Sequence, residues 1–166
     1  MKKILLLSMA AIGMTLFSCD DYLDINTDPN SPSAEQVSSD MLMPSVEMNL
    51  ASNYGDFLRI VGGYYSQHFA QTFGTSNYLD YSQFSMSATR CSGTYSDFYQ
   101  RVLNNIATIL DKSNAEESWG TYLAATTLRA FTLQTLVDCF GEVPYTEALD
   151  INNVSPKYDD GKVVYE

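Results

Sequence analysis

Cys19 is the residue with the most definite chemistry in this sequence, because it ends an N-terminal segment typical of export. Lysines at positions 2 and 3 precede an apolar run over residues 4–16, which leads into Leu-Phe-Ser-Cys, a sequence similar to a bacterial lipid-attachment site. The run is shorter than the roughly 20 residues that a membrane-spanning helix needs. We predict that residues 1–18 are a lipoprotein signal peptide and that acyl chains on Cys19 anchor the mature chain. The alternative is an ordinary signal peptide cut elsewhere, with Cys19 unmodified.

Catalytic chemistry has little support in the sequence. His68 is the only histidine, and nothing around it suggests a Ser-His-Asp triad or a multi-histidine metal site. The sequence also contains no Gly-rich phosphate loop and no GxSxG turn. We therefore predict that the protein is not an enzyme, that it uses no metal or other cofactor, and that His68 has a structural or surface role.

Cys91 and Cys139 are the other two thiols, and an exported protein can oxidise such a pair. Cys139 falls at the end of an apolar helical pattern, whereas Cys91 lies in a polar segment. This placement favours free thiols, buried or without function, over a disulfide.

The segment that follows Cys19 contains a partial calcium-binding pattern. Residues 24–30 carry oxygen ligands at alternate positions, and Glu35 stands where an EF-hand has its twelfth ligand. However, Pro29 occupies the position that requires glycine, and no helix precedes the pattern. Asx turns explain the same residues, so we interpret residues 19–35 as an acidic, Asn- and Pro-containing tether and keep calcium binding as the alternative.

Three aromatic rings lie in a polar segment over residues 74–93, which is rich in Ser, Thr, Asn and Gly. They are Tyr78, Tyr81 and Phe84. Exposed ring faces stack against the apolar faces of sugars, and neighbouring amides and hydroxyls can bond sugar hydroxyls. We therefore predict a glycan-binding site here. The alternative is that each ring packs onto the helices.

Helical periodicity dominates the remainder of the chain, over residues 36–166. Apolar residues at steps of three and four predict helices over 41–52, 54–73, 94–112, 116–140 and 162–166. Ser39 or Asp40 is the expected cap of the first helix, and Gly141 with Pro144 is expected to end the fourth. The sequence therefore predicts a mostly α protein with tetratricopeptide-like antiparallel helix pairs. The formal net charge of −11 argues against a nucleic-acid partner.

A string of twelve residues after the fourth predicted helix resembles a known family. Residues 138–149, Asp-Cys-Phe-Gly-Glu-Val-Pro-Tyr-Thr-Glu-Ala-Leu, are similar to a segment of the SusD/RagB family of outer-membrane nutrient-binding lipoproteins. Further stretches fit the same family: the acidic residues after Cys19, and residues 22–26, 28–30, 128–131, 156–159 and 164–165.

The resemblance implies a helical scaffold that is lipid-anchored in the outer membrane and exposed at the cell surface. Such a protein captures oligosaccharides, or in some members peptides, and delivers them to a SusC-like TonB-dependent transporter without catalysis. Family members are longer than this chain, so the resemblance also implies an N-terminal portion of the scaffold, truncated at the C-terminus. Two alternatives stay open: a helical-repeat scaffold lipoprotein that binds peptides or proteins but not glycans, and a lipoprotein hydrolase whose catalytic residues lie beyond this sequence.

Overall fold

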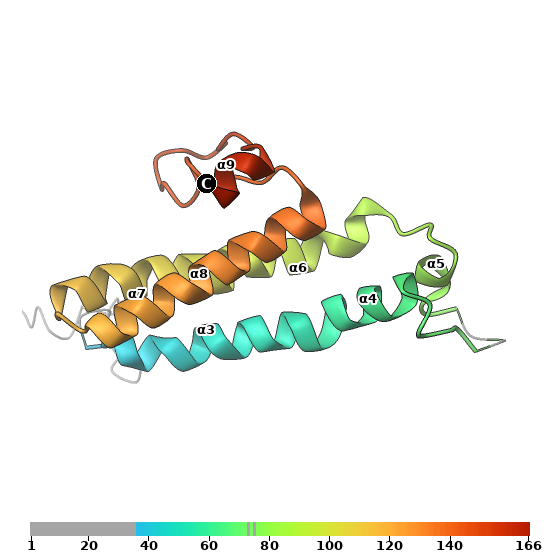
Figure 1. The fold of residues 1–166 in the computed structure, drawn as a ribbon, viewed down its shortest axis with the longest axis horizontal. Coiled ribbons are helices and arrows are strands. Elements are labelled where there is room, and N and C mark those ends of the chain that lie inside the picture. Colours follow the sequence, from blue (N-terminus) through green and yellow to red (C-terminus); the bar gives the residue numbers. More distant parts are fainter. Residues whose placement is uncertain (1–35, 73, 75) are drawn as a thin grey trace, which may run out of the picture. The chain divides into compact units, whose positions relative to one another are not determined.

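The computed structural model describes residues 36–72, 74 and 76–166 (Figure 1). The predicted signal peptide, Cys19, the tether over residues 19–35 and its calcium-like pattern lie outside the described residues and remain predictions. The described elements belong to one structural unit, Val37–Glu166.

Helices and their connections make up this unit, with no strand among the described residues and one isolated β-bridge. This confirms the predicted mostly α fold. The elements, labelled as in Figure 1, are α3 (Ser39–Asn53), the π-helical η1 (Tyr54–Leu58), α4 (Arg59–Tyr65), α5 (Leu79–Ser82), the 3₁₀-helical η2 (Ala88–Cys91), α6 (Ser92–Asp97), the π-helical η3 (Phe98–Leu103), α7 (Asn104–Ala115), α8 (Trp119–Phe140) and α9 (Gly161–Tyr165).

The first helical run is continuous from Ser39 to Tyr65, whereas the sequence predicted two helices separated near residue 53. Asn53 and Tyr54 keep right-handed helical dihedral angles, with φ of −62° and −68°. The chain therefore passes from α3 into α4 through the π-helical turn η1 rather than through a loop. The predicted break is wrong because the backbone absorbs the change in apolar pattern by widening one turn.

This run ends at Tyr65, although the apolar pattern predicted a helix as far as residue 73. Gln67 takes a φ of 61°, which turns the chain out of the helix. The N–H of Phe69 then donates to the carbonyl of Gly63 at 2.9 Å, and a Cβ atom on Gly63 would lie 2.2 Å from the Phe69 ring. Gly63 thus ends the helix by admitting a ring that folds back onto it.

The hydrophobic core lies between α3, the η3–α7 run and α8, which pack against one another in the unit (Figure 1). Consecutive runs are antiparallel, as the sequence predicted. The buried residues of this core are Val46, Leu50, Phe98, Val102, Leu103, Ile106, Ile109, Ala125, Leu133, Leu136 and Val143.

The turn between α7 and α8 also caps α3. Glu116 was expected in the first turn of the fourth helix, but α8 begins three residues later, at Trp119. The Glu116 carboxylate accepts hydrogen bonds from the backbone N–H of Ser39 at 3.3 Å and from its hydroxyl at 2.6 Å. The prediction that Ser39 or Asp40 caps α3 is wrong. The N-cap is Ser38, and its side chain makes no capping hydrogen bond. An acceptor from another element satisfies the first-turn amide instead.

The segment between α8 and α9, residues 141–160, is a folded strap rather than an open loop. Gly141 ends α8 with a φ of 79°, and its N–H donates to the carbonyl of Val137 at 2.8 Å, as the sequence predicted for a glycine stop. Val143 and Asp159 then form an antiparallel bridge. The Tyr99 hydroxyl donates to the carbonyl of Pro144 at 2.8 Å and ties the strap to η3. Within the described part of the chain, no helix has the length and apolar character to cross a membrane.

Candidate functional site

The predicted glycan-binding rings lie between α4 and α6, in a segment that contains α5 and η2. The structure separates the three rings by exposure. Tyr81 is buried, with 4% of its surface exposed, whereas Tyr78 is 36% exposed and Phe84 is 55% exposed. Packing therefore describes Tyr81 best, and Tyr78 and Phe84 keep surface that a ligand can reach.

Tyr78 and Tyr81 join Tyr64 from α4 in an aromatic cluster. The centroid of the Tyr64 ring lies 5.6 Å from that of Tyr78 and 6.1 Å from that of Tyr81, and the last two rings lie 5.8 Å apart. These distances are typical of favourable aromatic pairs. The cluster holds the segment against the end of α4, and burial raises the pKa of the Tyr81 hydroxyl, which keeps it neutral.

Phe84 forms a separate pair with Tyr65, which is 40% exposed. The two ring centroids are 5.2 Å apart. Phe84 has a φ of 55°, in the left-handed region that bulky residues rarely adopt, and its N–H donates to the carbonyl of Tyr81 at 3.2 Å. The turn thus presents an exposed aromatic pair beside the cluster.

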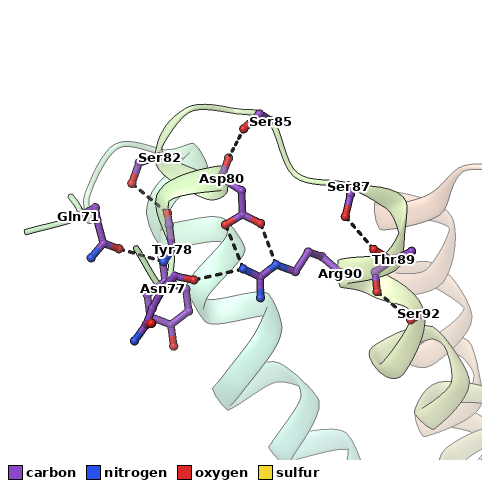
Figure 2. A network of polar contacts seen from close by, with 10 residues as sticks. All are labelled: Gln71, Asn77, Tyr78, Asp80, Ser82, Ser85, Ser87, Thr89, Arg90 and Ser92. Atoms are coloured by element: carbon purple, nitrogen blue, oxygen red, sulfur yellow. Dashed lines mark hydrogen bonds and ion pairs between the residues drawn. The ribbon is translucent and has the colours of Figure 1, made fainter. Parts of the chain in front are cut away.

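An ion pair closes the segment, as Figure 2 shows. Arg90 Nε lies 2.8 Å from Asp80 Oδ2 and Arg90 Nη2 lies 3.3 Å from Asp80 Oδ1, a two-point contact. Arg90 Nη2 also donates to the carbonyl of Asn77 at 3.2 Å, and the guanidinium lies 5.4 Å from the centroid of the Tyr81 ring. The hydrogen bond from Arg90 holds the pKa of Asp80 below its usual value.

A second polar contact joins the segment to the residues after α4. The side-chain oxygen of Gln71 accepts from the backbone N–H of Tyr78 at 3.1 Å (Figure 2). Together these contacts give a short segment two fixed ends and an aromatic surface between them. Such a surface can stack against a ligand and bond its hydroxyls, and no charged side chain has to move when the ligand binds.

Sequence reasoning missed Tyr64, Tyr65 and Arg90 as parts of this site. The apolar period indicates which side of a helix is buried, and it carries no information on whether the Tyr64 or the Tyr65 ring meets the segment that follows α4. One signal was present: Asp80 and Arg90 are the only charged residues between positions 74 and 93. A single pair of opposite charges in a polar segment suggests an ion pair that closes it.

The remaining residues considered for chemistry are His68, Cys91 and Cys139, of which Cys91 ends η2 within this segment. His68 is exposed, and its Nδ1 lies 2.9 Å from the hydroxyl of Ser66, a local contact. Cys91 and Cys139 are both free thiols, as expected, and burial raises the pKa of each. Over the described residues, no group of three His, Cys, Asp or Glu side chains is arranged to hold a metal.

Comparison with curated protein sequences finds no significant match to this chain. A family model does match: the SusD-like family described as starch-binding and associating with the outer membrane, over residues 29–166. This match covers all of the described helices and the string over residues 138–149 that carried the resemblance. The chain therefore belongs to this SusD-like family, which is defined by binding and not by a reaction.

Proposed function

We propose that this protein is a surface-exposed lipoprotein of the outer membrane that captures oligosaccharides and passes them to a SusC-like TonB-dependent transporter. The observation that carries the proposal is the exposed Tyr65–Phe84 pair beside the aromatic cluster, in a chain of a starch-binding family. The proposed ligand-binding residues are Tyr78, Tyr81 and Phe84, with Tyr81 supporting the surface from below.

The role of each residue follows from its exposure. Phe84 and Tyr65 offer ring faces for stacking against a sugar ring, and the exposed edge of Tyr78 extends that surface. The ion pair of Asp80 and Arg90 fixes the segment on which the rings stand. A surface that is ordered before binding loses less conformational entropy when the ligand arrives.

Anchoring and delivery complete the proposal. Acyl chains on Cys19 would hold the protein at the outer membrane, and residues 19–35 would act as the tether between the anchor and the helical unit. No step of bond breaking is assigned to the protein. The transporter would supply the energy for uptake.

The direct test is titration of maltoheptaose, a starch oligosaccharide, into the purified chain by isothermal calorimetry. We expect Phe84→Ala to weaken binding by roughly three- to tenfold, because one exposed ring contact is lost. Trp119→Ala is the matched control, since it removes an aromatic ring that is 60% exposed on α8, away from the segment. If both variants bind maltoheptaose as the wild type does, the assignment of this segment is wrong.

One observation favours the alternative of a protein- or peptide-binding scaffold. Leu123 and Phe131 are exposed on α8, on a helix whose buried side contains Ala125 and Leu136. Such surface is suited to contact with another protein. The calorimetric test separates the two functions, because a scaffold without glycan affinity gives no heat of binding with maltoheptaose.

A further inference from the structure

A cleft that contains none of the rings of the first site lies between the α6–η3 run and the strap after α8. It has a volume of about 570 Å³. Its lining residues are Tyr95, Ser96, Tyr99, Gln100, Pro144, Ala148, Leu149, Val154, Ser155, Pro156 and Tyr158. A smaller hollow of about 360 Å³ shares Tyr95, Ser96 and Tyr158, and its wall also includes Phe140 and, from η2, Ala88 and Cys91. We call these two neighbouring hollows the tyrosine cleft.

The lining of the tyrosine cleft indicates the charge of its ligand. None of the lining residues of either hollow is Asp, Glu, Lys or Arg. An anionic or cationic ligand would therefore lose its hydration without gaining a charged partner. Rings, prolines and aliphatic side chains alternate with hydroxyls and an amide, a combination that suits a neutral molecule with both apolar faces and hydroxyl groups.

One hydroxyl in the cleft has no well-formed hydrogen bond. The Tyr95 hydroxyl is buried and meets no partner with normal hydrogen-bond geometry among the described residues, and the hydroxyls of Tyr158 and Tyr99 are its polar neighbours. Its ring packs against Tyr99 and Phe140, each with a centroid 5.1 Å away. The Tyr99 hydroxyl, by contrast, is committed to the carbonyl of Pro144. A buried hydroxyl without a partner is unfavourable in the folded protein, so its position on a cleft wall points to a partner supplied from outside.

Tyr158 gives the tyrosine cleft an aromatic ring that a ligand can reach. It is 61% exposed and borders both hollows. Its neighbour Asp159 is buried and bonded to the backbone of Thr146, so the ring stands on a fixed part of the strap.

We propose that the tyrosine cleft is a second saccharide site, in which a neutral sugar ring stacks on Tyr158 and a sugar hydroxyl bonds the Tyr95 hydroxyl. This proposal rests on the proposed function, since it assumes that the protein binds oligosaccharides. It adds a site that uses α6, η3, the strap and part of η2, separate from the rings between α4 and α6. A long oligosaccharide would then contact the protein at two places, which increases its apparent affinity.

Two variants of the full chain test the cleft by calorimetric titration with maltoheptaose. Tyr95→Phe removes one oxygen and leaves the ring, so we expect roughly five- to tenfold weaker binding at this site. The same variant should melt at the wild-type temperature or higher, because it removes the unpaired buried hydroxyl. Tyr158→Ala should weaken binding at the same site by a similar factor, while Phe84→Ala should leave it unchanged.

The outcomes separate this inference from the proposed function. Wild-type affinity in both Tyr95→Phe and Tyr158→Ala, with maltoheptaose still bound, overturns the cleft and leaves the function in place. A Tyr95→Phe variant that loses both affinity and thermal stability also overturns it, because the hydroxyl is then structural. No maltoheptaose binding by the wild type contradicts the proposed function itself and the cleft with it.

Discussion

Asp159 shows at the residue scale how one carboxylate organises the strap after α8. Its Oδ2 accepts from the backbone N–H of Thr146 at 2.7 Å and from that of Tyr145 at 3.1 Å. The Thr146 hydroxyl donates to the same oxygen at 2.9 Å. These hydrogen bonds, the one from the Thr146 N–H above all, hold the pKa of Asp159 below its usual value despite burial. The Asp159 carboxylate must therefore stay ionised to keep these hydrogen bonds.

Substitution of Asp159 should make the stability of the folded protein depend less on pH in the acidic range. The folded protein binds a proton at Asp159 more weakly than the unfolded chain does. The contribution of Asp159 is therefore complete above the unfolded pKa of about 3.9 and is lost as pH falls through the lower folded value. We expect Asp159→Asn to melt several degrees below the wild type at pH 7, with the difference shrinking toward pH 3.

The measurement is thermal unfolding followed by circular dichroism between pH 3 and pH 7. Glu142→Gln is the control, because it removes one negative charge from an exposed position in the same strap. A difference between wild type and Asp159→Asn that stays constant across this pH range would show that the carboxylate charge is not what holds the strap.

Cys19 gives the second prediction at this scale. If acyl chains on Cys19 anchor the protein, Cys19→Ala should move the exported chain from the membrane fraction to the soluble fraction. Cys91→Ala and Cys139→Ala should stay with the membrane, because they remove the other two thiols and spare the anchor. Intact-mass measurement of the mature wild-type chain should find lipid on an N-terminal Cys19. An unmodified mature chain, or one that starts elsewhere, contradicts this prediction.

At the scale of the element, two neighbouring glycines explain why the sequence did not predict where α4 ends. The apolar period identified the helices around α3, α7, α8 and α9 well, because periodicity reports the side that is buried. It could not show that α4 ends at Tyr65, since that end depends on the Phe69 ring that folds back over Gly63. The period also does not distinguish Gly62 from Gly63, although a Cβ atom added at Gly62 would meet no atom within 4 Å.

This difference between neighbouring glycines can be measured. Gly62→Ala should stabilise the protein by about 1 kcal/mol, because alanine restricts the unfolded chain and fits the open helix surface. Gly63→Ala should lose that gain, because its Cβ would meet the Phe69 ring and force it away. Urea unfolding of both variants gives the comparison. Equal stabilisation by the two substitutions would contradict the packing of Phe69 onto Gly63.

At the scale of the whole molecule, the fold class was predictable and the site was predictable only in part. The string over residues 138–149 identified the family, yet its residues end α8, begin the strap and supply part of the wall of the tyrosine cleft, and none lies in the first candidate site. The aromatic segment was found from composition. Its division into a buried Tyr81 and an exposed Phe84 was not, because exposure depends on contacts with Tyr64 and Tyr65 from another element.

Hydrogen–deuterium exchange of the full chain, with and without maltoheptaose, tests the central claim most directly. If the protein captures oligosaccharides on the segment between α4 and α6, saturating maltoheptaose should slow amide exchange over residues 76–87, which do not line the tyrosine cleft, while the amides of α8 around Leu123 should exchange as before. Unchanged exchange over residues 76–87 with maltoheptaose bound, or no binding of maltoheptaose at all, would contradict the account.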